Sequence, residues 1–516
     1  MLKPLLAFGY LPRELPPLFG SESFAALSSS TNELPTSITK DKADWTQPTH
    51  HNLARVGGLR RRLTVPNPAN YFRLASVFDK HNAALVAEWK KSPYSQTLPK
   101  VSTCGPRGIA NEPPDRAIAK ANARVGARYL LRADISQFYP SVYTHTISWA
   151  LHTKQVAKAA FKDMSLAENA LDKELQACQL GQTKGIAIGP DTSLGVAELL
   201  LAPIDRRLKD ECRIMGGVRF IDDMEFNFHK LADAEAALAR LESMLYEYEL
   251  QLNGNKTRIL ELPESLESRY VTELRRHIPT LTGGTNSQWI DYFNHAFMLA
   301  KEHPLEGVLR YAIAALQGVT ATAKCWSIAQ ILLWQSVALD PGCLRFVTDV
   351  LLLHKHRASR EPNSDIARTA VEALIVSSAP VGHGSEILWS IWTALQLGLT
   401  LSADAQRAIA GMDDAFVAVA AMVTKERKVF AEDFTSPLWE SWLVEDCFHQ
   451  FHQDHWLLGY EANRRGWFTE KVRAARVDSE PTVKALTDAG VTFINDKKLD
   501  EYLPNKLVVC SGGGDS

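Results

Sequence analysis

Several features that would assign this chain of 516 residues to a class at once are missing from it. Its seven cysteines are odd in number and include no C-x-x-C pair, which predicts a reduced, cytoplasmic chain without a disulfide framework. No apolar run reaches the ~18 residues that suggest a membrane span, so no membrane partner is expected. The apolar N-terminus lacks a charged leader and is broken by four prolines within its first 17 residues, which does not fit a signal peptide.

A large net charge is also missing, but the basic residues are unevenly distributed. The formal net charge is −2, so nothing in the whole chain indicates bulk attraction to a polyanion. Residues 100–132 nevertheless hold seven Lys or Arg against two Asp or Glu, a local net charge of +5. A second basic cluster consists of Arg55, Arg60, Arg61 and Arg62. Such patches on a nearly neutral chain suit local contacts with phosphate groups.

The length predicts two or three domains, and the sequence changes character at about residue 285. Up to that point, short apolar strands alternate with helical patterns. From 286 to about 425, amphipathic helices follow one another at about 20-residue intervals, which fits either HEAT-like repeats or a plain helical bundle. We therefore predict a mixed α and β region over 1–285, an all-α region over 286–510 and a disordered tail over 511–516.

The stretch GGVRFIDDMEF, residues 216–226, carries two adjacent aspartates between two apolar runs. Residues 218–220 and 224–229 each alternate apolar and polar side chains, which predicts two strands that flank a tight turn at Asp222 and Asp223. Asp is common in turns, so this stretch taken alone is typical of a polar hairpin tip. Adjacent carboxylates are also what a two-metal site requires from one of its strands.

Three other elements give the aspartate pair a context. Asp134 ends a short apolar strand within 128–135, so a third carboxylate can converge on the pair. A turn at Gly189 leads into a helix over 193–213 that we expect to be capped near 191–193 and bent at Pro203. Lys256 follows a turn in LNGNKT and can supply a proton. Taken singly, these elements equally fit a strand end, a helix start and a solvated turn lysine.

The order of these elements over roughly 125 residues resembles the palm of reverse transcriptases. ADISQFY, GPDTS, FIDD and LNGNKT look like successive palm motifs. YPSVYTHTISWALH, QTKGIAIGPDTS and PNPANYFRL are similar to segments of the bacterial abortive-infection and defence-associated reverse transcriptases. The resemblance covers residues of about 55–285 and implies an α+β fold: right-hand polymerase fingers and palm with an antiparallel palm sheet, followed by an all-α C-terminal domain.

The resemblance also implies roles for individual residues. Two Mg²⁺ ions, with Mn²⁺ as an alternative, would be bound by three carboxylates and one backbone carbonyl: Asp134, Asp222, Asp223 and Ile135. Lys256 would face the leaving pyrophosphate, and Tyr139 would exclude a ribose 2′-hydroxyl. Further contacts to the incoming nucleotide or the template are expected from Phe138, Gly189, Ser193, Arg116 and Lys120. Arg116, Lys120 and Arg124 recur at every fourth residue, so they also fit a solvated helix face.

Two departures from the family pattern leave the mode of synthesis open. Phe220 stands where the usual residue is tyrosine, and Ile188 where many relatives carry glutamine. The implied function is a reverse-transcriptase-type DNA polymerase in bacterial antiphage defence that uses dNTPs and makes a DNA product. Its template is an RNA, such as a non-coding RNA, or synthesis is template-independent or primed by a protein tyrosine, for which Tyr460 and Tyr502 are candidates. A homo-oligomer or a partner defence protein is left open. The competing hypotheses are an inactive RNA-binding scaffold and a palm-type nucleotide cyclase.

A histidine-rich stretch near the C-terminus, CFHQFHQDHW, also contains zinc-ligand types. Cys447, His449, His452 and His455 cannot all converge from one short helix, so we expect an aromatic-rich helix there and not a zinc site.

Overall fold

The computed structural model describes residues 1–29, 44–102, 107–110, 115–152, 154–160, 163–278, 281, 284–431, 433–443, 451–467 and 480–504. The fold is α+β, as predicted. The predicted tail at 511–516 lies outside the described residues. None of the described helices is both long enough and apolar enough to cross a membrane.

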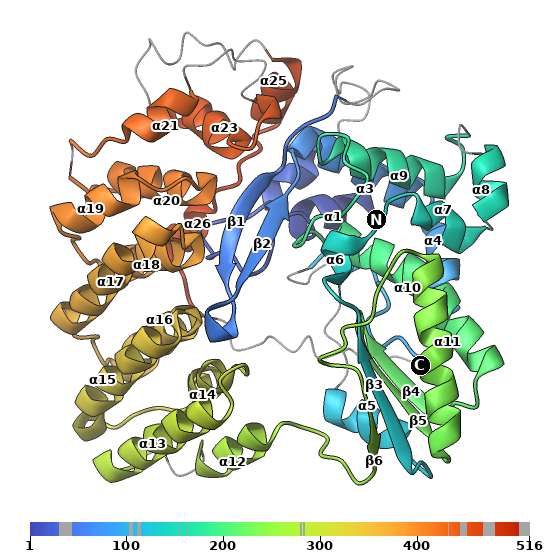
Figure 1. Ribbon diagram of the computed structural model, residues 1–516. Coiled ribbons are helices and arrows are strands. Elements are labelled where there is room, and N and C mark those ends of the chain that lie inside the picture. The colour runs from blue at the N-terminus through green and yellow to red at the C-terminus, as the bar shows by residue number, and fades with distance from the viewer. Residues whose placement is uncertain are drawn as a thin grey trace, which may run out of the picture.

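A four-stranded antiparallel sheet with the order β4-β5-β3-β6 organises the first half of the chain (Figure 1). Its strands are β3 (Tyr129–Asp134), β4 (Gly216–Phe220), β5 (Asp223–Phe228) and β6 (Arg258–Glu261). The buried side chains of Leu131 and Ala133 pair across the sheet with Phe226 and Met224. This apolar face packs against α11 (Leu231–Glu247), while the opposite face meets α5 (Arg116–Ala123). The strands predicted around the three aspartates are therefore confirmed.

Helices surround this sheet and fill the rest of the first half. They are α1 (Leu2–Phe8), η1 (Glu22–Ser29), α3 (Pro68–Lys80), α4 (Asn82–Trp89), α6 (Phe138–Ser141), α7 (Thr146–Leu151), α8 (Lys154–Ala160), α9 (Ala167–Ala177) and α10 (Asp191–Glu211). Helix α10 continues through Pro203 as one element, so it is not interrupted there, and the predicted bend stays a prediction. The predicted side-chain cap is wrong. Asp191 instead accepts hydrogen bonds from the backbone of Gly108, Ile109 and Ala110.

The second half consists of stacked helices. In chain order they are α12 (Arg269–His277), α13 (Asn286–Glu302), α14 (Val308–Ala315), α15 (Ala323–Leu339), α16 (Leu344–Ala358), α17 (Ser364–Ser378), α18 (Gly384–Leu397), α19 (Ala403–Ala410), α20 (Ala415–Glu426), α21 (Pro437–Trp442), α23 (Trp456–Arg465), α25 (Pro481–Asp488) and α26 (Asp496–Asp500). Alternate helices contact one another, so α13, α15, α17 and α19 form one layer and α14, α16, α18 and α20 the other (Figure 1). Of the two predicted arrangements, the structure has the helical repeat.

A β-hairpin joins the two halves. Strands β1 (Thr49–Ala54) and β2 (Arg60–Val65) pair with each other and stand between the helical layers and α10 (Figure 1). On the helical side, His51 Nδ1 lies 2.7 Å from an oxygen of Asp414. On the other side, the Thr64 amide donates to the Ile188 carbonyl at 2.9 Å. The hairpin thus ties the helical repeat to the turn that precedes α10.

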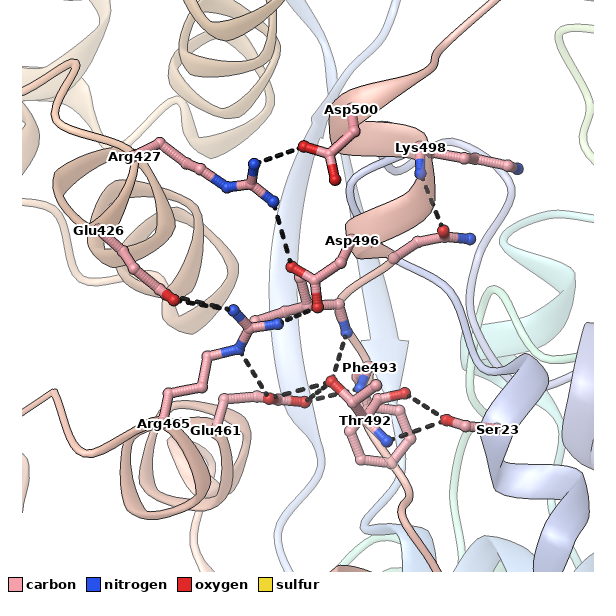
Figure 2. Close-up of polar contacts among 12 residues, drawn as sticks. Ser23, Glu426, Arg427, Glu461, Arg465, Thr492, Phe493, Asp496, Lys498 and Asp500 are labelled. Atoms are coloured by element: carbon pink, nitrogen blue, oxygen red, sulfur yellow. Dashed lines mark hydrogen bonds and ion pairs between the residues drawn. The ribbon is translucent and has the colours of Figure 1, made fainter.

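The ends of the chain form a second connection (Figure 2). Phe19 and Ile494 form an isolated antiparallel bridge, and Ser23 exchanges hydrogen bonds with the backbone of Thr492. The buried carboxylate of Glu461 on α23 accepts from the Phe493 amide at 2.6 Å, while Arg465 pairs with Asp496. The N-terminal segment is therefore held by the C-terminal segment that follows α25.

Candidate active site

The three predicted metal-ligand aspartates lie together at one end of the sheet. Asp134 is the last residue of β3 and stands directly opposite Asp223, the first residue of β5. Asp222 lies in the turn between β4 and β5. The turn is one residue earlier than predicted, because Asp223 already pairs with Phe220 in the β4–β5 ladder. It therefore consists of Ile221 and Asp222.

A loop between α11 and β6 holds Asp134. Lys256 Nζ lies 2.8 Å from one carboxylate oxygen of Asp134, and Asn253 Nδ2 donates to the other at 3.0 Å. The Asn253 amide also donates to the Asp134 carbonyl at 2.7 Å. Lys256 thus lies beside Asp134. The contact between Asn253 and Asp134 was not predicted from the sequence. The available signal was the Asn-Gly pair of LNGNKT, which marks a turn.

The cations of α5 face the carboxylates of β5. Arg116 lies 3.1 Å from Asp223 and places its guanidinium 4.3 Å from the centre of the Phe220 ring. Lys120 and Arg124 both pair with the buried Glu225, at 3.5 and 2.7 Å. The predicted common face of these cations is confirmed, and it turns toward the sheet. Phe220 therefore forms a cation–π contact with Arg116, and this contact requires the aromatic ring but no hydroxyl group.

Asp222 experiences an excess of negative charge. Burial raises the pKa of its carboxyl, and the charges of Asp134 and Asp223 raise it further. A hydrogen bond from its own backbone and the charge of Lys256 act in the opposite direction. Carboxylate oxygens are the ligands that Mg²⁺ takes in proteins, and a divalent cation would relieve this repulsion. The donor set therefore fits such ions.

The carboxylates are not gathered around one point. Within the part of the chain that the structure describes, no three His, Cys, Asp or Glu side chains are grouped closely enough to hold a metal ion. Lys256 forms an ion pair with Asp134, and Arg116 forms one with Asp223. A divalent ion that binds these carboxylates would therefore compete with two cationic side chains for them.

A buried ion-pair network contacts the turn at Ile221 and Asp222. Arg219, on β4, is fully buried and bonds Glu198 and Asp205 of α10, each at 2.8 Å. The same guanidinium donates to the Ile221 carbonyl at 3.0 Å, and the Ile221 amide donates to the Thr97 hydroxyl at 3.2 Å. This network was not predicted from the sequence. Its signal was an arginine in the middle of an apolar strand, where a charge requires partners.

Ile221 adopts an unusual backbone conformation between these contacts. Its φ is +60°, in the left-handed region that a β-branched side chain rarely adopts. Such a residue costs about 1–2 kcal/mol and persists only where its surroundings impose it. Arg219 and Thr97 hold both backbone groups of Ile221, so the strain is fixed next to Asp222.

We expect Ile221→Asn to cost little stability, because Asn tolerates the left-handed region. Ile259 is the matched control, since it is also partly buried but lies in β6. Its replacement by Asn removes apolar burial without relieving strain. Urea unfolding should show Ile259→Asn to be less stable than Ile221→Asn by about 1 kcal/mol or more. Equal losses would mean that Ile221 is unstrained.

The other predicted substrate contacts surround the aspartates. Tyr139 is partly buried, and its ring packs 5.4 Å from that of the buried Phe138. Burial raises the pKa of Tyr139, as do the nearby charges of Asp222 and Glu198, while Arg107 and Arg61 oppose the rise. Ile135 is buried and forms an isolated bridge with Leu252. Tyr139 is thus within electrostatic reach of Asp222.

The absence of a side chain at Gly189 allows another group to lie close to the turn, and this group is Pro12 of the same chain. Gly189 has a φ of +139°, and a Cβ there would lie 2.4 Å from Pro12 Cγ. The Gly189 carbonyl accepts from Arg107 at 3.1 Å. Ser193 donates to the Ala187 carbonyl at 2.6 Å, so it stabilises the turn.

The C-terminal candidates have structural surroundings. Tyr460 is fully buried and donates to the Val491 carbonyl, while Tyr502 donates to Asp349. His455 stacks on Trp442 and pairs with Asp413. Cys447 and His449 lie outside the described residues. The buried Tyr460 hydroxyl is therefore not available as a primer.

Comparison with known proteins agrees with the site. Residues 68–287 match the family model of reverse transcriptases, the RNA-dependent DNA polymerases, and all the active-site residues above lie within this range. No curated protein matches the chain. Among solved structures, the apo telomerase of Candida tropicalis is similar at a TM-score of 0.31 and 10% identity, over 75% of this chain and 67% of that one. That likeness is too weak to bear on function. The family match assigns the enzyme class of RNA-directed DNA polymerases to residues 68–287.

Proposed function

We propose that this reverse transcriptase domain adds deoxynucleotides to a 3′-hydroxyl at Asp134, Asp222 and Asp223. The pairing of Asp134 with Asp223 across β3 and β5 supports the proposal, with Asp222 beside them and its pKa raised by burial and by the charges of both. Three carboxylates at one end of the sheet repel one another, and cations placed between them reduce that repulsion. Two Mg²⁺ ions, or Mn²⁺, would activate the 3′-oxygen and neutralise the triphosphate when bound.

The protein groups around the aspartates would orient and protonate the reactants. The 3′-hydroxyl loses its proton to solvent and its oxygen forms a bond to the α-phosphorus, while the bond from that phosphorus to the α–β bridging oxygen breaks and pyrophosphate leaves. Lys256 lies beside Asp134 and would give its proton to the leaving pyrophosphate. Arg116, beside Asp223, would turn toward the triphosphate. Asn253 would keep Asp134 aligned through both of its hydrogen bonds.

Tyr139 would select deoxynucleotides. Its ring packs against Phe138 and lies within electrostatic reach of Asp222, which supports a position beside the sugar of a nucleotide bound at the aspartates. A ribose 2′-hydroxyl would then meet the ring. This role depends on the shape of the side chain and not on its ionisation.

The biological setting is proposed from resemblance. The segment YPSVYTHTISWALH is similar to bacterial defence-associated reverse transcriptases, which supports a cytoplasmic role against phage. In that setting, the helical region over 286–510 would act as a thumb and scaffold for the nucleic acid. The resemblance to reverse transcriptases implies an RNA template. Pro12 packs against Gly189, however, which supports synthesis in which this chain occupies part of the space expected for the template.

Incorporation of labelled nucleotides tests the proposal. Purified protein is incubated with each labelled dNTP or NTP and Mg²⁺, with and without RNase treatment of the enzyme. We expect a DNase-sensitive product from dNTPs only, because Tyr139 excludes ribose. A product that survives RNase pretreatment means that no RNA template is required. No incorporation of any dNTP under any of these conditions contradicts the proposal.

A further inference from the structure

Three arginines of the β1–β2 hairpin are exposed and lack an acidic partner. Arg55, Arg61 and Arg62 are exposed, and none of them forms an ion pair with a carboxylate in the described part of the chain. The neighbouring Arg60 differs, since it pairs with Glu386 at 2.5 Å and donates to Asn52. Arg60 thus attaches the hairpin to the helical repeat. The charges of the other three arginines are not used in an ion pair within the described residues.

The hairpin extends from the nucleotide site to the far helices of the repeat. At its base, Thr64 bonds Ile188, one residue before Gly189. At its tip, Arg310 of α14 donates to the Ala54 carbonyl, and a Cβ on Gly57 would touch Leu305. The hairpin is therefore fixed at both ends, and it stands between the helical layers and α10 (Figure 1).

Arg61, on β2, lies near the proposed nucleotide site. The charge of Arg61 lowers the pKa of Tyr139, in opposition to burial, so Arg61 is within electrostatic reach of that hydroxyl. Arg62 follows on β2, and Arg55 begins the turn that ends at Leu59. Arg62 lies opposite Asn52 and Arg61 opposite Leu53 in the hairpin register. Strand residues advance about 3.3 Å each, so the three cations are spread over roughly 10 Å along the tip half of the hairpin, in the order Arg62, Arg61 and Arg55 from base to tip.

The composition of the hairpin selects what it can bind. Residues 49–65 contain no Phe, Tyr or Trp, so no large aromatic ring is available for base stacking. Guanidinium groups bind phosphate oxygens and carry no sequence preference through such contacts. A row of cations that leads away from a catalytic centre suits a polymer, because a single nucleotide needs cations only at the centre itself.

We propose that Arg55, Arg61 and Arg62 bind the phosphate backbone of the single-stranded DNA product, a proposal that rests on the proposed function. The product strand is the one nucleic acid that the reaction always places at the aspartates, whichever template or primer is used. The hairpin is held rigidly by both halves of the chain, so the strand would pass along a fixed edge. Binding would be independent of sequence and sensitive to salt.

Binding of a fluorescein-labelled single-stranded oligodeoxynucleotide to the full chain tests this. The variant carries Arg55→Ala, Arg61→Ala and Arg62→Ala. The matched control carries Lys80→Ala, Lys90→Ala and Lys230→Ala, which removes the same charge from three exposed lysines of other elements. Fluorescence anisotropy should show about 10- to 100-fold weaker binding for the arginine variant at low salt. Its salt slope should fall by about 2, given ~0.7 per lost phosphate contact.

Other outcomes separate the alternatives. Unchanged affinity, or an equal loss in the control, overturns the proposal. A raised KM for dNTP with unchanged DNA affinity assigns the arginines to the nucleotide and also overturns it. A loss confined to an RNA oligonucleotide of the same sequence assigns them to a template. Arginine-dependent DNA binding in a wild-type chain that incorporates no dNTP would refute the proposed function while the surface stands. Thermal unfolding should not change, because all three side chains are exposed.

Discussion

Replacing Asp222 with Asn is expected to abolish nucleotide incorporation while making the folded chain more stable at neutral pH. Burial and the charges of Asp134 and Asp223 raise the pKa of Asp222 above its ordinary value. A carboxyl with a raised folded-state pKa binds its proton more tightly when folded, so the charged form opposes folding. Asn keeps the shape and removes the charge. The same change removes a proposed metal ligand, which should lower the rate by a factor of about 1,000 or more.

The pH dependence follows from the sign of the shift. Below the ordinary carboxyl range, wild type and Asp222→Asn should have similar stability, because Asp222 is then protonated in both the folded and the unfolded chain. The variant's advantage should grow as the pH rises through the raised pKa and then stay constant. Urea unfolding at several pH values measures it. Asp210→Asn, an exposed change on α10, is the control and should alter neither property. A variant that is less stable than wild type at pH 7 would show that Asp222 has an attractive partner.

Replacing Arg219 with Leu is expected to cause the largest loss of stability. Arg219 lies between Glu198 and Asp205, and all three side chains are buried. Removal of the guanidinium leaves two buried carboxylates without a cation, which costs about 3–5 kcal/mol. The pKa of Asp205 is already raised, mainly by burial, and Arg219 is the main influence that lowers it. Incorporation should be lost too, because Ile221 loses the donor that fixes its carbonyl.

Chemical unfolding measures this loss, and two further variants identify its cause. Arg206→Leu removes an exposed arginine from α10 and should cost less than about 0.5 kcal/mol. The combination of Arg219→Leu with Glu198→Gln and Asp205→Asn should recover part of the loss, since the unpaired charges are gone. If the triple variant is no more stable than Arg219→Leu alone, the loss comes from packing and not from charge.

The grouping of the candidate site residues was predictable because each part of the site has a local signal. The strand before Asp134, the paired aspartates and the turn before Lys256 are all visible as short patterns. Their convergence followed from their order along the chain. The turn position shifted by one residue because Asp223 joins the ladder of β5, and alternation alone does not fix where pairing begins.

The supporting contacts were not predictable, because they join residues far apart in the sequence. Arg219 bonds partners on α10, and nothing in an apolar strand says which carboxylates will be buried opposite it. Asp191 was expected to cap α10, yet it binds the backbone of residues 108–110. Both cases are tertiary contacts that override a local preference. The stacking of alternate helices in the second half likewise depends on inter-helix packing, which amphipathic periodicity does not specify.

If the three aspartates form a nucleotidyl-transfer site, incorporation by wild type and variants measured side by side will depend on Asp222. Wild type, Asp222→Asn and Asp210→Asn are purified identically and incubated with labelled dNTPs and Mg²⁺. We predict the same incorporation by wild type and Asp210→Asn and none by Asp222→Asn, although Asp222→Asn is folded. Incorporation by Asp222→Asn at the wild-type rate would contradict the assignment and attribute the activity to another site or to a contaminating polymerase.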